Sequence, residues 1–376
     1  MKTIKCQLCD HKATSGNLVP HLKEEHPEVS IKDYMTQFGG EDSLMDPTLM
    51  AKAKEEAAAK QKPAKQKKTT GEMMDLCGVE FPKRTGLSEE LKLQIPKANP
   101  VYRMQPMAET VAFDISKSNP VALSGHCGTG KTSLIYQMAA LTGNPVIRVN
   151  TNQQTSIADF VGTWVVKATE TGTTMEWIDG ALPYAMRHGC WLIIDEIDYA
   201  EPAILSALNA VLEPARTLML KQKGNESIVA HEDFRIFATG NTLGQMAEYR
   251  SLYQGTSIMN EAFVDRWRLH IVDYLPTELE VEVLTASVQG MTAPTARNMV
   301  KVAACVRKAF LEETGQSTFS TRRLIDWGEM MVHFARKKLA RNAPMKAAES
   351  TVLSKISRED ATAFTGYVQR VFFTKS

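Results

Sequence analysis

The segment from Gly125 to Thr132 constrains the fold of this chain more than any other. Its residues, GHCGTGKT, fit the pattern G-x-x-x-x-G-K-[ST] and lie between a strand-like run, VALS, and a helix-like run, SLIYQMAAL. In such a unit the glycines let backbone N–H groups approach phosphates, and the helix N-terminus favours an anion. The pattern therefore predicts an α/β domain that binds a nucleoside triphosphate.

This loop supplies the residues expected to hold the nucleotide. Lys131 is expected to reach the β- and γ-phosphates, and the hydroxyl of Thr132 to bind Mg²⁺. A glycine-rich turn without ligand is the competing interpretation, but the flanking strand and helix favour a phosphate-binding loop. The rest of the predicted ATP-binding set comprises Gly125, His126, Cys127, Gly128, Thr129, Gly130 and Ser133.

A second apolar run, CWLIIDEID, ends in carboxylates. A carboxylate at the C-terminal edge of a parallel sheet faces the ligand crevice. We expect Asp195 to hold Mg²⁺ through water and Glu196 to polarise the water that attacks the γ-phosphate. Asn241 ends the next strand-like run, FRIFATGN, where we expect it to align that water; a turn-forming Asn is the alternative.

Strand-like runs alternate with helix-like runs from residue 99 onward, which indicates parallel strands joined by crossover helices. After Pro276 the strand signals stop, and we expect Thr277 to cap the first of several helices. The chain is thus predicted to hold a Cys/His-bearing module at 1–40, a charged linker at 41–75, an α/β core at 76–276 and a helical lid at 277–376.

The amino-acid composition restricts the kinds of partner that we expect this protein to bind. The 44 Lys and Arg residues nearly balance 43 Asp and Glu, so no overall field favours nucleic acid or a membrane. The apolar runs are far shorter than the roughly 20 residues of a bilayer span, and the N-terminus lacks an apolar signal core. We expect a cytoplasmic protein without a membrane partner. The Lys-rich stretch at 52–68 is the one candidate contact for nucleic acid, and its composition is that of a linker.

Four residues near the N-terminus have the spacing of a zinc site. Cys6, Cys9, His21 and His26 follow the pattern C-x2-C-x11-H-x4-H, and two thiolates with two imidazoles can complete a tetrahedral Zn²⁺ site. Positions five apart on a helix are about 140° out of phase, so we expect the helix to end near His26. His11 is a spare or an alternative ligand, and a reduced CxxC pair without metal is the competing interpretation. The acidic helix of this finger favours partner docking over DNA binding.

Together these segments resemble the AAA+ superfamily, within it the MoxR-like group, and most closely the CobS-type ATPase subunits of aerobic cobaltochelatases. The resemblance covers roughly residues 121–328 and implies a P-loop AAA+ core, a parallel sheet flanked by helices, followed by a helical lid. It is carried, in family order, by SGHCGTGKT, IRVNTNQQTSIADFVG, DGALPYAMRHGCWLIIDEID, ALNAVLEPARTLML, FRIFATGNTLG, LYQGTSIMNEAFVDRW and STFSTRRLIDW.

The resemblance implies roles for two arginines. Arg266 matches the arginine finger, which enters the site of a neighbouring subunit, with Arg268 as the alternative. Arg322 matches the second sensor on the lid. The proline that usually precedes that sensor is Thr321 here, and Arg323 follows directly, so the sequence leaves open which of the two arginines faces the nucleotide.

The resemblance also places two hairpins near the pore of a ring. Segments 162–180 and 216–234 match these positions, and both independently read as ribbon arms around a Gly-containing turn. Surface hairpins without client contact are the alternative.

A member of this family is expected to form a homo-hexameric ring that uses ATP and Mg²⁺, here with Zn²⁺ in the N-terminal module. A CobS-type ring would act with a CobT-like adhesion-domain protein on a CobN-like chelatase subunit, coupling ATP hydrolysis to Co²⁺ insertion into hydrogenobyrinic acid a,c-diamide in cobalamin biosynthesis. The alternatives are a MoxR-like chaperone with another client, for instance phage-encoded, and a nucleic-acid-associated ATPase. A scaffold that binds ATP without turnover is disfavoured by the intact Glu196.

Overall fold

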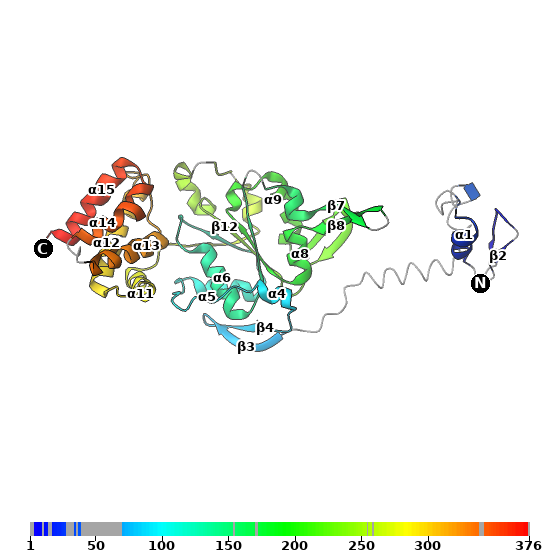
Figure 1. Ribbon diagram of the computed structural model, residues 1–376, viewed down its shortest axis with the longest axis horizontal. Helices are drawn as coiled ribbons and strands as arrows, with labels where there is room; N and C mark the ends of the chain where they lie inside the picture. Colours follow the sequence, from blue (N-terminus) through cyan, green and yellow to red (C-terminus); the bar gives the residue numbers. More distant parts are fainter. Residues whose placement is uncertain are drawn as a thin grey trace. The chain divides into compact units, whose positions relative to one another are not determined.

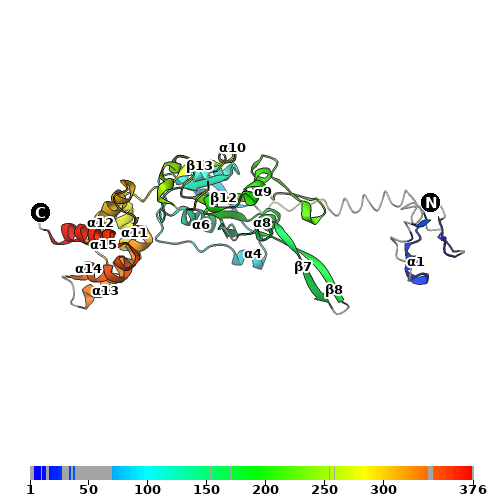
Figure 2. The same cartoon turned by 90° about the horizontal axis from the view of Figure 1, so that it is seen from above.

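A computed structural model describes two units of this chain, residues 1–69 and 70–376 (Figures 1 and 2). The described residues are 4–9, 11–13, 17–27, 34, 37–38, 70–152, 155–169, 172–253, 255–257, 259–337 and 342–374. The predicted linker up to residue 69, including the Lys-rich stretch at 52–68, lies outside them.

The described part of the first unit is a small module that includes helix α1. Its core consists of Cys6, Ala13, Leu18, Leu22 and Tyr34. Helix α1 ends at Glu25, and His26 has a non-helical backbone with φ −132°. The predicted end of the helix at His26 is thus confirmed. The elements are β1 (Ile4–Lys5) and β2 (Lys12–Ala13), which pair antiparallel, and α1 (Val19–Glu25).

The second unit is built on a five-stranded sheet in which every strand pair is parallel, as the alternation of runs predicts. The strand order is β13-β5-β12-β9-β6, so β12 lies between β5 and β9. The carboxyl ends of β5, β9 and β12 therefore meet at one edge. The strands are β5 (Val121–Ser124), β6 (Val146–Asn150), β9 (Trp191–Asp195), β12 (Arg235–Gly240) and β13 (Arg268–Ile271).

Helices cover both faces of this sheet. In β9, Trp191 and Ile193 enter one apolar cluster, while Leu192 and Ile194 enter the other, because successive side chains of a strand point to opposite faces. All four side chains are fully buried. The first cluster is completed by α5 (Ala108–Ser116), α6 (Lys131–Thr142) and the hairpin of β3 (Thr70–Leu76) and β4 (Val79–Arg84). The second is completed by α7 (Ile157–Val161), α8 (Ala181–His188) and α9 (Pro202–Leu212).

Three antiparallel hairpins accompany the sheet. Figure 2 shows the longest of them projecting away from α8. Both hairpins expected from the sequence are confirmed. Strand β3 begins at residue 70, ahead of the core boundary that we predict at 76. The hairpins are β3 (Thr70–Leu76) with β4 (Val79–Arg84), β7 (Gly162–Thr169) with β8 (Gly172–Asp179), and β10 (Thr217–Leu220) with β11 (Glu226–Val229).

The described residues after Pro276 are helical where they are regular, as predicted, and form a cluster around the buried Trp327. The expected cap is wrong in one detail. Thr277 is the first residue of its helix, Pro276 holds the cap position, and no side chain caps that end. The helices are α11 (Thr277–Ser287), α12 (Ala293–Leu311), α13 (Thr321–Arg336), α14 (Ala343–Thr351) and α15 (Arg358–Val368).

The remaining elements are short. None of the helices in the described part of the chain is long and apolar enough to cross a membrane. These elements are the helices α4 (Glu89–Leu93) and α10 (Glu261–Val264), the 3₁₀ segments Ile197–Tyr199, Lys221–Lys223, Gly244–Leu252 and Leu353–Lys355, and the π-helical segment Gln369–Phe373.

Candidate functional site

The loop between β5 and α6 has the backbone of a phosphate-binding loop. Gly128 and Gly130 have φ values of +76° and +93°, which a residue with a side chain rarely adopts. A Cβ at Gly125 would lie 2.2 Å from the carbonyl oxygen of Val272, so only glycine fits there. Helix α6 begins at Lys131, directly after the loop. The N–H groups of its first turn therefore face the loop, where they can bind an anion.

Thr132 and Asp195 lie together at the edge of the sheet. The Thr132 hydroxyl donates a hydrogen bond of 2.9 Å to Oδ1 of Asp195. Thr239, on the neighbouring strand β12, donates to the same oxygen. The side chain of Asp195 is only 8% exposed. A hydroxyl and a carboxylate at this spacing are the oxygen ligands that Mg²⁺ prefers.

Glu196 follows Asp195 in a backbone conformation that its residue type rarely adopts, with φ +58°. Its N–H donates to the Thr239 hydroxyl at 3.2 Å, which holds this turn in place. Burial, together with the charges of Asp195 and Asp198, raises the pKa of the Glu196 carboxyl. Left-handed conformations of bulky residues cluster at functional sites, and a raised pKa suits a general base.

Lys131 is held by three acceptors around the loop. Its ammonium donates to the carbonyl oxygens of Gly125 at 2.7 Å and His126 at 3.0 Å, and to Oδ1 of Asn241 at 2.9 Å. Burial lowers the pKa of Lys131 to about 8. Asn241 thus lies beside the phosphate-binding loop, at the end of β12, where the sequence places it.

The loop opens into a cleft of about 930 Å³ between the sheet edge and the lid. Glu196 and Asn241 line it, as do Asp195 and residues 127–133 of the loop. An apolar portion of its lining comes from both sides, from Val101, Tyr102, Tyr136, Leu275, Val283 and Ile325. The cleft therefore offers polar groups for a triphosphate and apolar surface for a base.

The two candidate sensor arginines point to different places. Arg322, on α13, lines the cleft. Arg323 instead donates to the carbonyl oxygen of Thr318 at 2.9 Å and lies over the ring of Phe319. The geometry favours Arg322 as the residue that faces a nucleotide.

Arg266 does not line the cleft of its own subunit. It forms an ion pair with Glu213 at 2.8 Å and is partly exposed. Arg268, the alternative, is 65% exposed and lies 4.0 Å from Asp114. An arginine outside the subunit's own site is what a finger acting on a neighbour requires.

Several side chains at this site carry no sequence signal of their own. Arg148, on β6, forms an ion pair with Oδ2 of Asp195. Asp198 is fully buried, and its Oδ2 accepts hydrogen bonds from the N–H of Asn241 at 2.8 Å and of Thr242 at 3.1 Å. The amide of Gln105 donates to the carbonyl oxygen of Thr129 at 2.9 Å. Arg148 and Asp198 are near the loop because of the strand order, and Gln105 because of the path of the chain before α5, neither of which the local sequence reveals.

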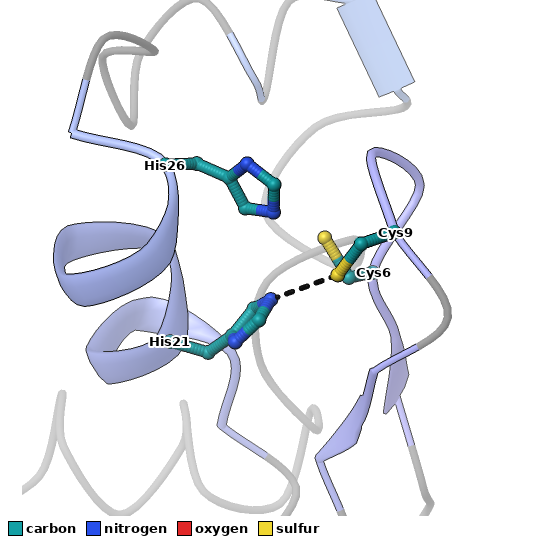
Figure 3. A group of neighbouring side chains, drawn as sticks. All are labelled: Cys6, Cys9, His21 and His26. Atoms are coloured by element: carbon teal, nitrogen blue, oxygen red, sulfur yellow. Dashed lines mark hydrogen bonds between the residues drawn. The ribbon is translucent and has the colours of Figure 1, made fainter.

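Cys6, Cys9, His21 and His26 converge in the first unit, as their spacing predicts (Figure 3). One ligand atom from each lies within 4.8 Å of all the others, and Sγ of Cys9 is 3.2 Å from Nε2 of His21. Tetrahedral zinc, with ligands at about 2.0 to 2.3 Å, needs donors roughly 3.5 Å apart, so small side-chain movements suffice. His11 stacks on His21 at a ring separation of 4.0 Å and is not a member of the four-residue cluster.

Two family descriptions match the second unit. Residues 120–266 match the AAA domain of the dynein-related subfamily, and residues 280–364 match the CbbQ/NirQ/NorQ C-terminal domain. The first match covers four of the five strands of the parallel sheet and the hairpins β7–β8 and β10–β11, and the second covers most of the helical lid.

Curated proteins agree with these matches. The chain is 33% identical to the aerobic cobaltochelatase subunit CobS of Sinorhizobium sp over 269 residues, which are 69% of this chain and 80% of CobS. It is 30% identical to the protein CbbQ of Hydrogenophilus thermoluteolus over 58% of this chain and 80% of that one. A 26% identical match to midasin of Dictyostelium discoideum covers 60% of this chain but only 4% of midasin. The chain belongs to the AAA+ ATPases, in the MoxR-like group that includes CobS and CbbQ.

Proposed function

We propose that this chain is a ring-forming ATPase of the CobS type, which couples ATP hydrolysis to the remodelling of a partner complex. The observation that carries the proposal is the convergence of Lys131, Thr132, Asp195 and Glu196 at one edge of the sheet, inside a cleft that Arg322 closes from the lid. Membership of the AAA+ ATPases implies ATP and Mg²⁺ as the ligands of this site.

Each residue has a distinct task in hydrolysis. Lys131 and the N–H groups at the start of α6 bind the phosphates, while Thr132 and Asp195 would hold Mg²⁺, which neutralises charge on the phosphate oxygens. Glu196, with its raised pKa, takes a proton from the attacking water, and Asn241 orients that water. Arg322 contacts the γ-phosphate from the lid.

The reaction is completed by a second subunit. Arg266 lies outside its own cleft and would enter the site of a neighbour in a homo-hexamer, stabilising charge on the γ-phosphate in the transition state. The Arg266→Ala variant should bind ATP but lose most of its hydrolysis, about 10³-fold or more. Full activity of this variant would contradict the ring.

Mixing two inactive variants tests the shared site directly. A subunit with Arg266→Ala keeps Glu196, and a subunit with Glu196→Gln keeps Arg266, so a mixed ring contains some interfaces with both residues. We expect each variant alone to be nearly inactive and their mixture to recover hydrolysis. Failure to recover activity, with mixed rings shown by mass spectrometry, would place finger and base in the same subunit.

The projecting hairpin β7–β8 supports contact with a client. It exposes the apolar residues Trp164, Val165, Val166, Met175 and Ile178, and large exposed apolar patches mark protein interaction sites. Trp164 also donates from its indole nitrogen to the carbonyl oxygen of Gln222, which links this hairpin to β10–β11. We propose that the hairpins contact the protein that the ring remodels.

Similarity to CobS suggests which client this is. The proposed partners are a CobT-like adhesion-domain protein and a CobN-like chelatase subunit, with cobalt insertion into hydrogenobyrinic acid a,c-diamide as the process that ATP drives. The test is ATP-dependent Co²⁺ insertion by the reconstituted subunits. Val166→Asp should abolish insertion while ATP hydrolysis by the ring alone persists, and Lys167→Ala is the matched control on the exposed, ion-paired neighbour. Hydrolysis without insertion in the unaltered chain would favour a chaperone with another client.

We further propose Zn²⁺ as the ligand of the Cys6, Cys9, His21 and His26 cluster, on the convergence of four donors of the right chemistry. The module that it stabilises would dock a partner. Metal analysis should find one zinc per chain, and none in protein prepared without chelator would contradict the site.

A further inference from the structure

Two tyrosine hydroxyls bind the backbone N–H and C=O groups of Cys127 in the phosphate-binding loop. The N–H of Cys127 donates to the hydroxyl of Tyr253 at 3.3 Å, and the carbonyl oxygen of Cys127 accepts from the hydroxyl of Tyr274 at 3.0 Å. Neither tyrosine belongs to the loop. Tyr253 follows the 3₁₀ segment Gly244–Leu252, and Tyr274 lies in the connection between β13 and the first lid helix, α11.

The Tyr253 hydroxyl anchors the loop to the core. It lies 2.9 Å from Nδ1 of His126, and burial lowers the pKa of that imidazole, which favours its neutral form. A neutral Nδ1 can accept from the Tyr253 hydroxyl while that hydroxyl accepts from Cys127. The Tyr253 hydroxyl then has one partner for its proton and one for its lone pair.

The Tyr274 hydroxyl reaches the lid instead. It lies 2.6 Å from the Thr318 hydroxyl, which can donate to it while Tyr274 donates to the loop. Thr318 is two residues before Ser320, the cap of α13, which carries Arg322. Ser320 itself contacts the loop, since a Cβ at Gly128 would lie 2.1 Å from the Cβ of Ser320.

The ring of Tyr274 is fixed by a buried ion pair of the lid. The Arg307 guanidinium lies 3.9 Å from the centre of this ring. It makes two hydrogen bonds of 2.7 and 2.8 Å to Glu280, and Glu280 also accepts from the hydroxyl of Thr321 at 2.8 Å. Thr321 stands where the family usually has proline, and its hydroxyl connects the start of α13 to the same ion pair.

We propose that Tyr274 is a positioning residue that ties the N-terminus of α13 to the phosphate-binding loop, so that Arg322 is set to contact the γ-phosphate of a nucleotide on that loop. This inference rests on the proposed ATP site. Loss of the hydroxyl should weaken the contact that distinguishes ATP from ADP, while the phosphates common to both remain bound by Lys131.

Tyr274→Phe tests the coupling because phenylalanine keeps the ring beneath Arg307 and removes only the hydroxyl. We expect the preference of the 376-residue chain for a non-hydrolysable ATP analogue over ADP, measured by titration calorimetry with Mg²⁺, to fall about three- to tenfold, the range for one lost hydrogen bond. Thr318→Val, which removes the hydroxyl on the other side, should give the same change. Tyr367→Phe, on the lid helix α15, is the control and should not change this preference.

A double-mutant cycle separates positioning from a general structural effect. If Tyr274 acts through Arg322, adding Tyr274→Phe to Arg322→Gln should change the ATP-to-ADP preference less than twofold. An equal loss in both backgrounds, or a wild-type preference in both Tyr274→Phe and Thr318→Val, would overturn the inference. A wild-type chain that binds neither nucleotide would contradict the proposed function itself.

Discussion

The two units of this chain bring polar side chains together by different means. In the second unit, Thr132, Asp195 and Asn241 lie at the ends of strands and a helix that are fixed by two extensive apolar clusters. Among the described residues of the first unit, the buried core is Ala13, Leu18, Leu22 and Tyr34 together with Cys6, which also belongs to the four-residue Cys/His cluster. A core that small supplies little stability, so the proposed zinc would contribute much of the folding free energy there. The nucleotide site, in contrast, is formed by a scaffold that does not depend on its ligand.

Zinc removal gives the largest expected difference between the units. Zinc binding contributes roughly 10 kcal/mol or more to the folding of small zinc modules. Chelation, or Cys9→Ser, should unfold the described residues of the first unit around α1 and leave ATP hydrolysis by the second unit within about twofold. Proteolysis of the full chain followed by mass spectrometry measures this. Equal protection of the N-terminal sites with and without chelator would show that the small core suffices.

Breaking the buried ion pair of the lid tests how far the second unit depends on polar contacts. Glu280 is 1% exposed and Arg307 is 7% exposed. Arg307→Met leaves a buried carboxylate without its partner, which should destabilise the fold by about 3 to 5 kcal/mol in chemical denaturation. The double variant Glu280→Gln with Arg307→Met should recover part of this loss. No loss in the single variant would mean that Glu280 is solvated or protonated.

The fall of kcat for ATP hydrolysis at acidic pH tests the role of Glu196. Protonation of Glu196 removes the general base. Because its pKa is raised, this protonation begins at a higher pH than in an ordinary glutamate, whose pKa is about 4.3. kcat should therefore fall as the pH drops through this raised value. The charge of Arg148 opposes the shift, so Arg148→Gln should move the fall to still higher pH. If kcat fell at the pH of an ordinary glutamate in both proteins, Glu196 would not be the general base.

Lys131 gives the smallest of the expected effects. With a pKa of about 8 in the absence of ligand, Lys131 is partly neutral at pH 8.5, and bound phosphates favour its charged form. ATP binding at that pH should take up a fraction of a proton, measured by calorimetry in buffers of different ionisation enthalpy. Lys131→Arg should bind without uptake, because a guanidinium does not titrate there.

Sequence predicted those parts of the molecule whose signal is local. The five strands, both hairpins and the end of α1 at His26 each follow from a periodic run or a breaker nearby. Arg148 and Thr239 were not predicted, because their contact with Asp195 depends on β6 and β12 lying on either side of β9. The sequence predicts Thr277 as the cap of its helix, whereas it is the first residue of that helix, since a proline at the preceding position already sets the extended turn.

The measurement closest to the central claim is turnover of Mg·ATP by the zinc-loaded 376-residue chain at ring-forming concentration, compared with turnover by Glu196→Gln. We expect hydrolysis by the unaltered chain, and a loss of about 10² to 10⁴-fold in the variant. The variant should still bind Mg·ATP, because Lys131, Thr132 and Asp195 remain. Binding without turnover in the unaltered chain, or equal turnover in both, would contradict an ATPase site at this edge of the sheet.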